Sequence, residues 1–222
     1  MQKRLVIAID GPSGSGKSST SREVARRLGL GYLDTGAMYR AVAVAFLDSG
    51  VSRDDTAGII AATRGANIEL SLDPDQRWVR VNGREVTDEI REPRTSAQVS
   101  AVATIPECRA DLVARQRALM DADPRGVVAE GRDITTVVYP DAGLRLLLTA
   151  SPEARLRRRR GDLGAGVSDA DLRDQVLRRD RDDSTLVEFS TPAEGVTLLD
   201  TSEMTFEQVV DRIVSLAQEV RA

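Results

Sequence analysis

The chain has 222 residues, 41% of them hydrophobic and 30% charged, as expected for a globular protein of one domain or of one domain with insertions. Its formal net charge of −4 argues against wholesale coating of nucleic acid and against an anionic membrane surface as partner. Histidine is absent, which excludes Ser-His-Asp triads, Cys-His pairs and histidine-based metal sites.

The first apolar run, residues 5–9, is too short for the core of a secretory signal, and no later run is long enough to cross a membrane. The single cysteine, Cys108, cannot form an internal disulfide, and we interpret it as a small residue on a helix. We therefore expect a cytoplasmic protein with no membrane partner.

Residues 11–18 match the phosphate-binding pattern G-x-x-x-x-G-K-[ST] and follow the apolar run directly. Backbone amides of such a loop form a concave nest around phosphates, Lys17 reaches the β- and γ-phosphates, and the Ser18 hydroxyl ligates Mg²⁺. A helix predicted over 18–28, ending at Gly29, adds the positive end of its dipole. The sequence thus predicts a nucleoside-triphosphate site. Its residues are Gly11, Pro12, Ser13, Gly14, Ser15, Gly16, Lys17 and Ser18.

Residues 34–40 follow a short strand-like segment and open a second helix. Thr35 and Tyr39 lie one turn apart on the same face, and Arg40 is adjacent. This cluster suits a second phosphate plus a sugar or base. The alternative is helix capping by Asp34 or Thr35 with a surface arginine.

Residues 65–86 break the pattern of the rest of the chain. Apolar residues alternate at 68–72 and 78–81, a turn is indicated at 73–75, and Asn82-Gly83 is a hairpin signal. A small antiparallel insert is therefore predicted between helices, on a mobile lobe at the substrate side.

The other apolar strand candidates, 127–129, 144–148 and 196–199, lack polar alternation, as is typical of parallel strands covered on both faces. Helices are predicted over 106–120, from a capping box at Ser168 and Asp171, and from another at Thr205 and Gln208. The inner face of the first is expected to carry Leu112, Val113 and Leu119. The buried stripe of the last is expected to be Val209, Val210, Ile213, Leu216, Ala217 and Val220. Strands alternating with helices predict an α/β fold with a doubly wound parallel sheet.

Residues 130–133, Glu-Gly-Arg-Asp, follow the strand 127–129 and so lie at the edge of the sheet where ligands bind in open α/β folds. Arg132 could grip a phosphate, and Asp133 could accept a hydrogen bond from an exocyclic amine. The alternative is a turn whose charges pair with each other.

A run of arginines occupies one predicted helix ahead of the glycine-containing stretch 161–166, and more arginines follow that stretch. We interpret the run as a lid that closes over the transferred group and excludes water, and the alternative is a solvated helix face. The run comprises Arg155, Arg157, Arg158, Arg159 and Arg160, and the later group Arg178, Arg179 and Arg181.

Together, the segments 11–19, 33–40, 115–117, 130–134 and 178–180 resemble those of bacterial cytidylate kinases, and the resemblance extends over essentially the whole chain. It implies transfer of the γ-phosphate of ATP to CMP or dCMP with Mg²⁺. It further implies a single P-loop kinase domain. The implied division is a core of about 1–34, 121–150 and 190–222, a monophosphate-binding lobe of about 35–120 with its β insert at about 65–90, and a lid of about 151–170.

The resemblance also implies roles for individual residues. The loop from Gly11 to Ser19 would hold ATP, with Arg155 and Arg159 reaching it from the lid. Lys17, Arg132, Arg159 and Arg179 would be the catalytic cations. Acceptor contacts would come from Thr35, Tyr39, Arg40, Gly131 and Arg132 for the phosphate and sugar, from Ser100, Arg109 and Asp133 for the cytosine edge, and from Arg179 and Asp183 for the phosphate and ribose.

One departure concerns Leu186, which stands where family members often carry an arginine. It leaves the choice between ribose and deoxyribose open, and acceptance of UMP as well. Two other readings also stay open, namely another small P-loop kinase and a nucleotide-dependent switch. A guanine-specific switch would need an N-K-x-D motif, which is impossible here because Lys3 and Lys17 are the only lysines. We expect a monomer that binds small molecules and no nucleic acid.

Overall fold

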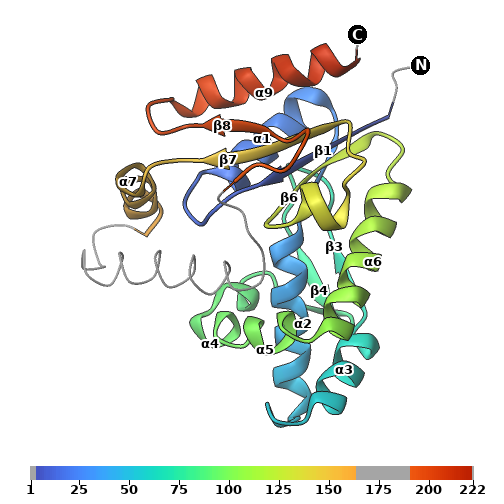
Figure 1. The fold of residues 1–222 in the computed structure, drawn as a ribbon. Coiled ribbons are helices and arrows are strands. Elements are labelled where there is room, and N and C mark those ends of the chain that lie inside the picture. Colours follow the sequence, from blue (N-terminus) through green and yellow to red (C-terminus); the bar gives the residue numbers. More distant parts are fainter. Residues whose placement is uncertain (1–3, 164–190, 222) are drawn as a thin grey trace.

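The computed structural model describes residues 4–163 and 191–221, and of residues 159 and 161–163 it describes the backbone alone (Figure 1). Its main sheet has five parallel strands in the order β2-β6-β1-β7-β8. The bounds of these strands are β1 (Leu5–Asp10), β2 (Gly31–Asp34), β6 (Gly126–Gly131), β7 (Leu144–Thr149) and β8 (Thr197–Asp200). The predicted parallel sheet and its strand candidates are confirmed.

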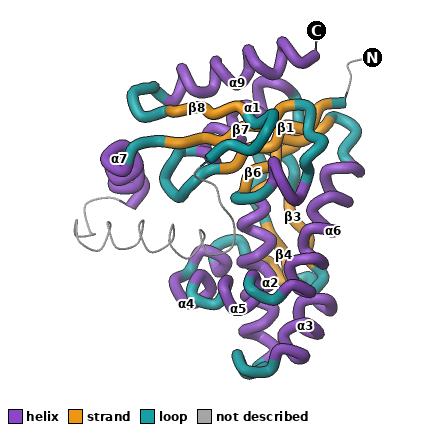
Figure 2. Tube along the Cα trace, viewed as in Figure 1, coloured by secondary structure: helices purple, strands orange, loops and turns teal. Residues whose placement is uncertain are grey.

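Helices cover both faces of this sheet, as Figures 1 and 2 show. One face carries α1 (Lys17–Leu28) and α9 (Phe206–Arg221), and the other carries α2 (Thr35–Ser49), α6 (Pro106–Ala122) and the π-helical turn η2 (Ile134–Val138). Along β1, Val6 and Ala8 pack into the core on the α2 and α6 side, whereas Ile7 and Ile9 pack on the α1 and α9 side. This two-sided burial explains why the strand reads as one continuous apolar run.

The chain leaves β1 for β2 on one side of the sheet and later continues to β7 and β8 on the other. The loop after β1 therefore lies where the strand order reverses, which is the place where open α/β sheets bind ligands.

The small antiparallel sheet predicted near residue 75 is present, with strand order β3-β4-β5. Its strands are β3 (Ile68–Leu70), β4 (Val79–Val81) and β5 (Arg84–Glu85). The β4–β5 turn has positive φ at both central residues, 51° at Asn82 and 80° at Gly83, as the hairpin signal required. The sheet packs on α2, whose side chains there are mostly alanine and so allow close approach.

Two contacts tie this insert to the main sheet and its helix layer. The backbone N–H of Tyr32 in β2 donates to the Leu72 carbonyl at 2.8 Å, and Arg26 of α1 pairs with Asp75 at 2.7 Å. The remaining described helices are α3 (Thr56–Gly65), η1 (Glu89–Arg91), α4 (Pro93–Ser96), α5 (Val99–Ala103) and α7 (Pro152–Leu163).

The predicted ends of two helices agree with the structure. Helix α1 ends at Gly29 in the left-handed conformation, and α9 is opened by the reciprocal Thr205–Gln208 capping box. On α6, Leu112 and Val113 are buried and Leu119 is half-buried, while Cys108 lies on this helix, as expected, and is fully buried. The helix predicted from Ser168 lies outside the described residues.

One part of the predicted α9 stripe is wrong. Val220 is 45% exposed, because the last turn lies at the rim of the sheet beside Gly143, which has no side chain to cover it. Leu216 is half-buried, and the other four residues of the stripe are buried. None of the helices within 4–163 and 191–221 combines the length and apolar character needed to cross a membrane.

Candidate active site

The loop between β1 and α1 adopts a backbone that glycine alone accommodates. Gly14 and Gly16 have φ of 76° and 86°, and Gly11 has φ of 156°. A Cβ added at Gly11 would collide with the carbonyl oxygen of Leu148 in the adjacent strand β7. The predicted phosphate-binding loop is thus held against the sheet by a contact that tolerates no side chain at its first glycine.

We therefore expect Gly11→Ala to displace the loop and weaken ATP binding by about 100-fold or more, since the backbone amides that face phosphate would move. The matched control is Gly29→Ala, which also places a Cβ at positive φ (64°) but meets no atom within 4 Å. This control is expected to lose about 1 kcal/mol of stability and to keep its ATP affinity. Fluorescence titration with an ATP analogue and urea unfolding measure both, and equal ATP affinity in the two variants would contradict the assignment.

Lys17 opens α1 and is only 7% exposed. Its Nζ donates to the Pro12 carbonyl at 3.3 Å, which curls the side chain back over the loop. Ser18 and Ser19 follow on the exposed side of the first turn. The loop therefore presents its lysine and its hydroxyls at the amino end of one helix, where the dipole favours anions.

Glu130, at the carboxyl end of β6, is a buried carboxylate beside this loop. Its Oε1 accepts a hydrogen bond from the Tyr32 hydroxyl at 2.8 Å, and Ser18 donates to it as well. Burial and the neighbouring Asp34 raise the pKa of Glu130, whereas Lys17 and the two hydrogen bonds oppose that rise. No role was predicted for Glu130, although an acidic residue at the end of a buried strand beside the P-loop is the signal that could have identified it.

The amino end of α2 meets the same region. Asp34 caps the helix by accepting from the Ala37 N–H at 2.9 Å, and its other carboxylate oxygen accepts from Arg40 at 3.0 Å. The Thr35 hydroxyl donates to the Glu130 carbonyl at 2.7 Å and is buried. The capping alternative is thus correct for Asp34, and the Thr35 proton is engaged by the backbone.

Arg109 of α6 and Asp133 form an ion pair next to Tyr39. Burial, together with the charge of Asp133, raises the pKa of Tyr39 to about 12, so this residue is a neutral phenol. Asp133 is buried. Its charge partner comes from a helix far away in the sequence, so the alternative in which Asp133 pairs within its own turn is wrong.

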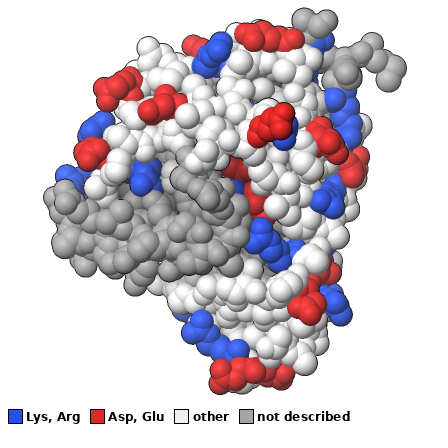
Figure 3. Space-filling view, in the orientation of Figure 1, with Lys and Arg blue, Asp and Glu red and all other residues white. Residues whose placement is uncertain are grey.

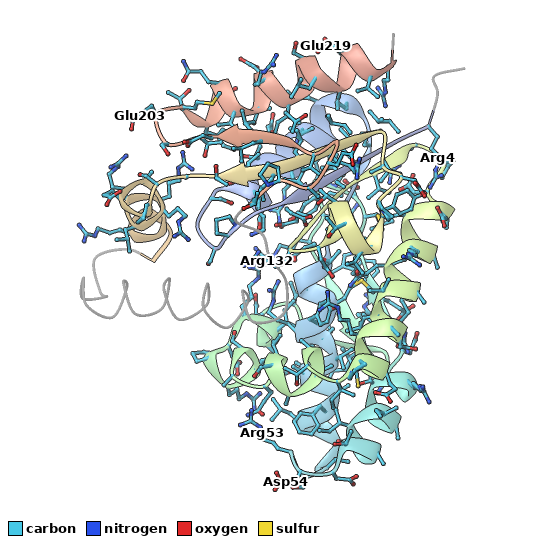
Figure 4. All side chains as sticks on the ribbon, viewed as in Figure 1. Arg4, Arg53, Asp54, Arg132, Glu203 and Glu219 are labelled. Carbon is cyan, nitrogen blue, oxygen red and sulfur yellow. The ribbon has the colours of Figure 1, made fainter. Side chains whose placement is uncertain are left out.

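Arg132 lies at the boundary between the sheet and the helical region that contains α4 and α5 (Figure 4). At this boundary Lys and Arg atoms lie beside Asp and Glu atoms on the face seen in Figure 3. Gly131 packs so closely on Thr35 and Ile134 that an added Cβ would meet both side chains. Ser100 is exposed on α5, and its carbonyl accepts from the Thr104 hydroxyl at 2.7 Å.

Two arginines of α7 hold this helix against the P-loop. Arg155 is 7% exposed and donates to the Ser13 carbonyl at 3.1 Å. Arg158 donates to the Ser15 carbonyl at 3.0 Å, and its two terminal nitrogens donate to the hydroxyl and the carbonyl of Thr201. Burial lowers the pKa of Arg158. Arg157 and Arg160 are exposed, so the predicted arginine run divides into an inner pair and an outer pair.

The arginines of the segment 115–117 have capping roles. Arg115 donates to the carbonyls of Arg64 (3.0 Å) and Ala66 (2.5 Å) at the end of α3. Arg117 donates to the carbonyls of Val137 and Val138, both at 2.7 Å, at the end of η2. Both interactions satisfy carbonyl groups that helices leave unpaired at their carboxyl ends. The predicted site residues Arg179 and Asp183, and the side chain of Arg159, lie outside the described residues.

A glycine-rich loop between the central strand of a parallel sheet and a helix is a phosphate-binding P-loop, so the fold and the site define a P-loop nucleotide-binding protein. The chain belongs to the cytidylate kinase family, whose model, described as "Cytidylate kinase", matches residues 7–219. It is similar to a cytidylate kinase of Cutibacterium acnes, with 51% identity over 96% of this chain and 95% of the relative. A cytidylate kinase of Corynebacterium efficiens is 47% identical over 96% of this chain and 94% of its own length.

Among solved structures, the chain is similar to a gluconokinase from Sinorhizobium meliloti 1021, with TM-score 0.53 and 14% identity over 99% of this chain and 95% of that one. A shikimate kinase from Bacteroides thetaiotaomicron gives TM-score 0.51 and 14% identity over 96% and 98% of the two chains. At this identity the two likenesses bear on the fold alone.

Proposed function

We propose that this chain transfers the γ-phosphate of ATP to CMP and dCMP, forming ADP and CDP or dCDP. Membership of the cytidylate kinase family supports the reaction. The observation that carries the choice of base is the Arg109–Asp133 ion pair beside Tyr39.

This pair is complementary to cytosine. The exocyclic amine of cytosine donates to a carboxylate, and its ring nitrogen and carbonyl accept from a guanidinium. Uracil presents an acceptor where cytosine presents the amine, so it would face the Asp133 carboxylate with no proton to donate. A buried polar group left unpaired in this way is the basis of strong discrimination between such bases.

The reaction needs no side-chain base, because the attacking group is the phosphate oxygen of the acceptor, which is already an anion. The obstacle is repulsion between two polyanions, which the protein must offset while it aligns them. We assign the backbone of residues 11–16, Lys17 and the dipole of α1 to the ATP phosphates. Arg40 and Arg132 are assigned to the acceptor phosphate, together with Arg179, and Arg155 and Arg159 to ATP.

Thr35, Gly131 and Ser100 keep their proposed places around the acceptor, and Asp183 its contact with the ribose. For Thr35, the engaged hydroxyl limits this to accepting a hydrogen bond, since its proton is used on the Glu130 carbonyl. At Gly131 an added Cβ would meet the Thr35 hydroxyl, so a side chain there would displace a group that we assign to the acceptor.

The residues present fit Mg²⁺. Ser18 donates its proton to Glu130, so both lone pairs of its hydroxyl oxygen stay available to a cation. Among the described residues no group of three or more His, Cys, Asp or Glu could hold a metal. This composition suits an ion that takes most of its ligands from water and nucleotide phosphates. When bound, Mg²⁺ neutralises charge on the phosphate oxygens. We propose Ser18 as its protein ligand, with Glu130 orienting that hydroxyl.

The test is ADP release from ATP with CMP, dCMP, UMP, AMP and GMP as separate acceptors. The proposal predicts that kcat/KM for CMP and dCMP exceeds that for AMP and GMP by about 100-fold or more. Preference for a purine monophosphate or a small metabolite would point to another P-loop kinase. ATP hydrolysis that no monophosphate stimulates would favour a switch. The monomeric state, the cytoplasmic location and the division into core, lobe and lid stay predictions, and light scattering on a sizing column tests the first.

A further inference from the structure

Asp10 is the last residue of β1, immediately before the P-loop, and it is 2% exposed. Its carboxylate accepts three hydrogen bonds from the start of η2. Oδ1 accepts from the Ile134 N–H at 2.8 Å, and Oδ2 accepts from the Thr135 N–H at 2.8 Å and from the Thr135 hydroxyl at 2.6 Å. One buried carboxylate thus joins the strand that leads into the ATP loop to the turn that carries Arg132 and Asp133.

The hydrogen bonds that Asp10 accepts cap the amino end of η2, a task that usually falls to the residue directly before a helix. Asp133 directly precedes η2, and an aspartate at that position normally turns its carboxylate back onto the unpaired N–H groups of the first turn. Asp133 makes no such bond. The N–H groups of Ile134 and Thr135 are already taken by Asp10, and the Asp133 carboxylate instead pairs with Arg109.

We propose that Asp10 is a positioning residue of the acceptor site, which caps η2 in place of Asp133 and so keeps the Asp133 carboxylate directed at Arg109 and the acceptor base. This inference rests on the proposed function of the Arg109–Asp133 pair. Asp10 is buried and its carboxylate is used on η2, so its effect on the reaction is expected to pass through the orientation of Asp133.

The first test is Asp10→Asn, which keeps the shape of the side chain but replaces one accepting oxygen by an NH₂ group. That group cannot accept from Thr135, so the Asp133 carboxylate becomes the competing cap and turns away from Arg109. We expect the KM for CMP to rise about 10-fold or more, and the preference for CMP over UMP to fall by a similar factor. The KM for ATP and kcat at saturating CMP are expected to change less than about threefold.

The second test is a double-mutant cycle of Asp10→Asn with Asp133→Asn. If Asp10 acts through Asp133, Asp10→Asn adds nothing to the CMP KM of Asp133→Asn, whereas independent effects would multiply. The control Thr135→Val removes the hydroxyl contact and keeps both backbone contacts. Its CMP KM is expected to stay within about twofold of the wild-type value.

Three outcomes would overturn the inference. Asp10→Asn could lose stability while its CMP KM and base preference stay unchanged, or its KM values for ATP and CMP could rise equally. In the double-mutant cycle, the third such outcome is that the effects of the two substitutions on the CMP KM multiply. Should Asp10→Asn not fold, amide exchange in the wild-type protein decides. The N–H groups of Ile134 and Thr135 must exchange slowly without CMP, and rapid exchange contradicts the cap. Failure of the proposed function itself would appear earlier, in the acceptor panel of the wild-type enzyme.

Discussion

Replacing Lys17 by alanine is expected to lower kcat with ATP and CMP by about three orders of magnitude or more. The reason is that Lys17 is the cation that opens α1 within the phosphate loop, and its loss leaves the γ-phosphate charge less neutralised during transfer. Steady-state ADP release measures the effect. The matched control is Lys3→Ala, which removes the other lysine of the chain. Turnover near the wild-type rate in Lys17→Ala would refute the assignment.

The same substitution has a pH-dependent cost in stability. Burial already raises the pKa of Glu130, and loss of Lys17 removes a charge that counteracts the rise. When a carboxyl has a higher pKa in the folded than in the unfolded protein, the protein becomes less stable as the pH rises from the unfolded pKa towards the folded one. Lys17→Ala should therefore be more destabilised at pH 8 than at pH 5, and adding Glu130→Gln should remove this difference without restoring activity. Urea unfolding at the two pH values tests it, and a pH-independent loss would contradict the coupling.

Asp133→Asn is expected to raise the KM for CMP by about 100-fold and to reduce the preference for CMP over UMP by a similar factor. The asparagine amide can donate to the uracil oxygen that the carboxylate repels, so the KM for UMP should stay about the same or fall. Fold and ATP binding should persist, because Arg109 is partly exposed and can be solvated once unpaired.

The control for this prediction is Asp111→Asn. This change weakens another ion pair of α6, the helix that carries Arg109, in which Asp111 pairs with Arg115 at 2.7 Å. Its CMP and UMP kinetics should match the wild type. If Asp133→Asn keeps the wild-type ratio of CMP to UMP, the base is read by other groups.

Much of the fold could be predicted because its causes are local. The continuous apolar strands, the Gly29 cap, the Asn82-Gly83 hairpin and the Thr205 capping box each depend on a few neighbouring residues, and all are present. Val220 was predicted wrongly because periodicity describes a helix face and carries no information on where the sheet beneath it ends.

The site was predictable to the extent that its residues sit in motifs. Residues 11–18 and 130–133 can be recognised from local sequence patterns, whereas their hydrogen-bond and ion-pair partners lie on elements far away in the sequence. Arg158 bracing Ser15, Tyr32 donating to Glu130, and Asp10 capping η2 all depend on long-range packing, which no spacing in the chain records. For the same reason the sequence could not tell that the Thr35 hydroxyl is used by the backbone.

Calorimetric titration of the purified protein with CMP, alone and with a non-hydrolysable ATP analogue, tests the central claim most directly. The predicted result is that CMP binds, that UMP binds about 100-fold more weakly than CMP, and that Asp133→Asn binds CMP about 100-fold more weakly than the wild type does. Absence of heat from cytidine nucleotides, with or without the analogue, would contradict the claim that the Arg109–Asp133 pair reads a cytosine base next to the ATP loop.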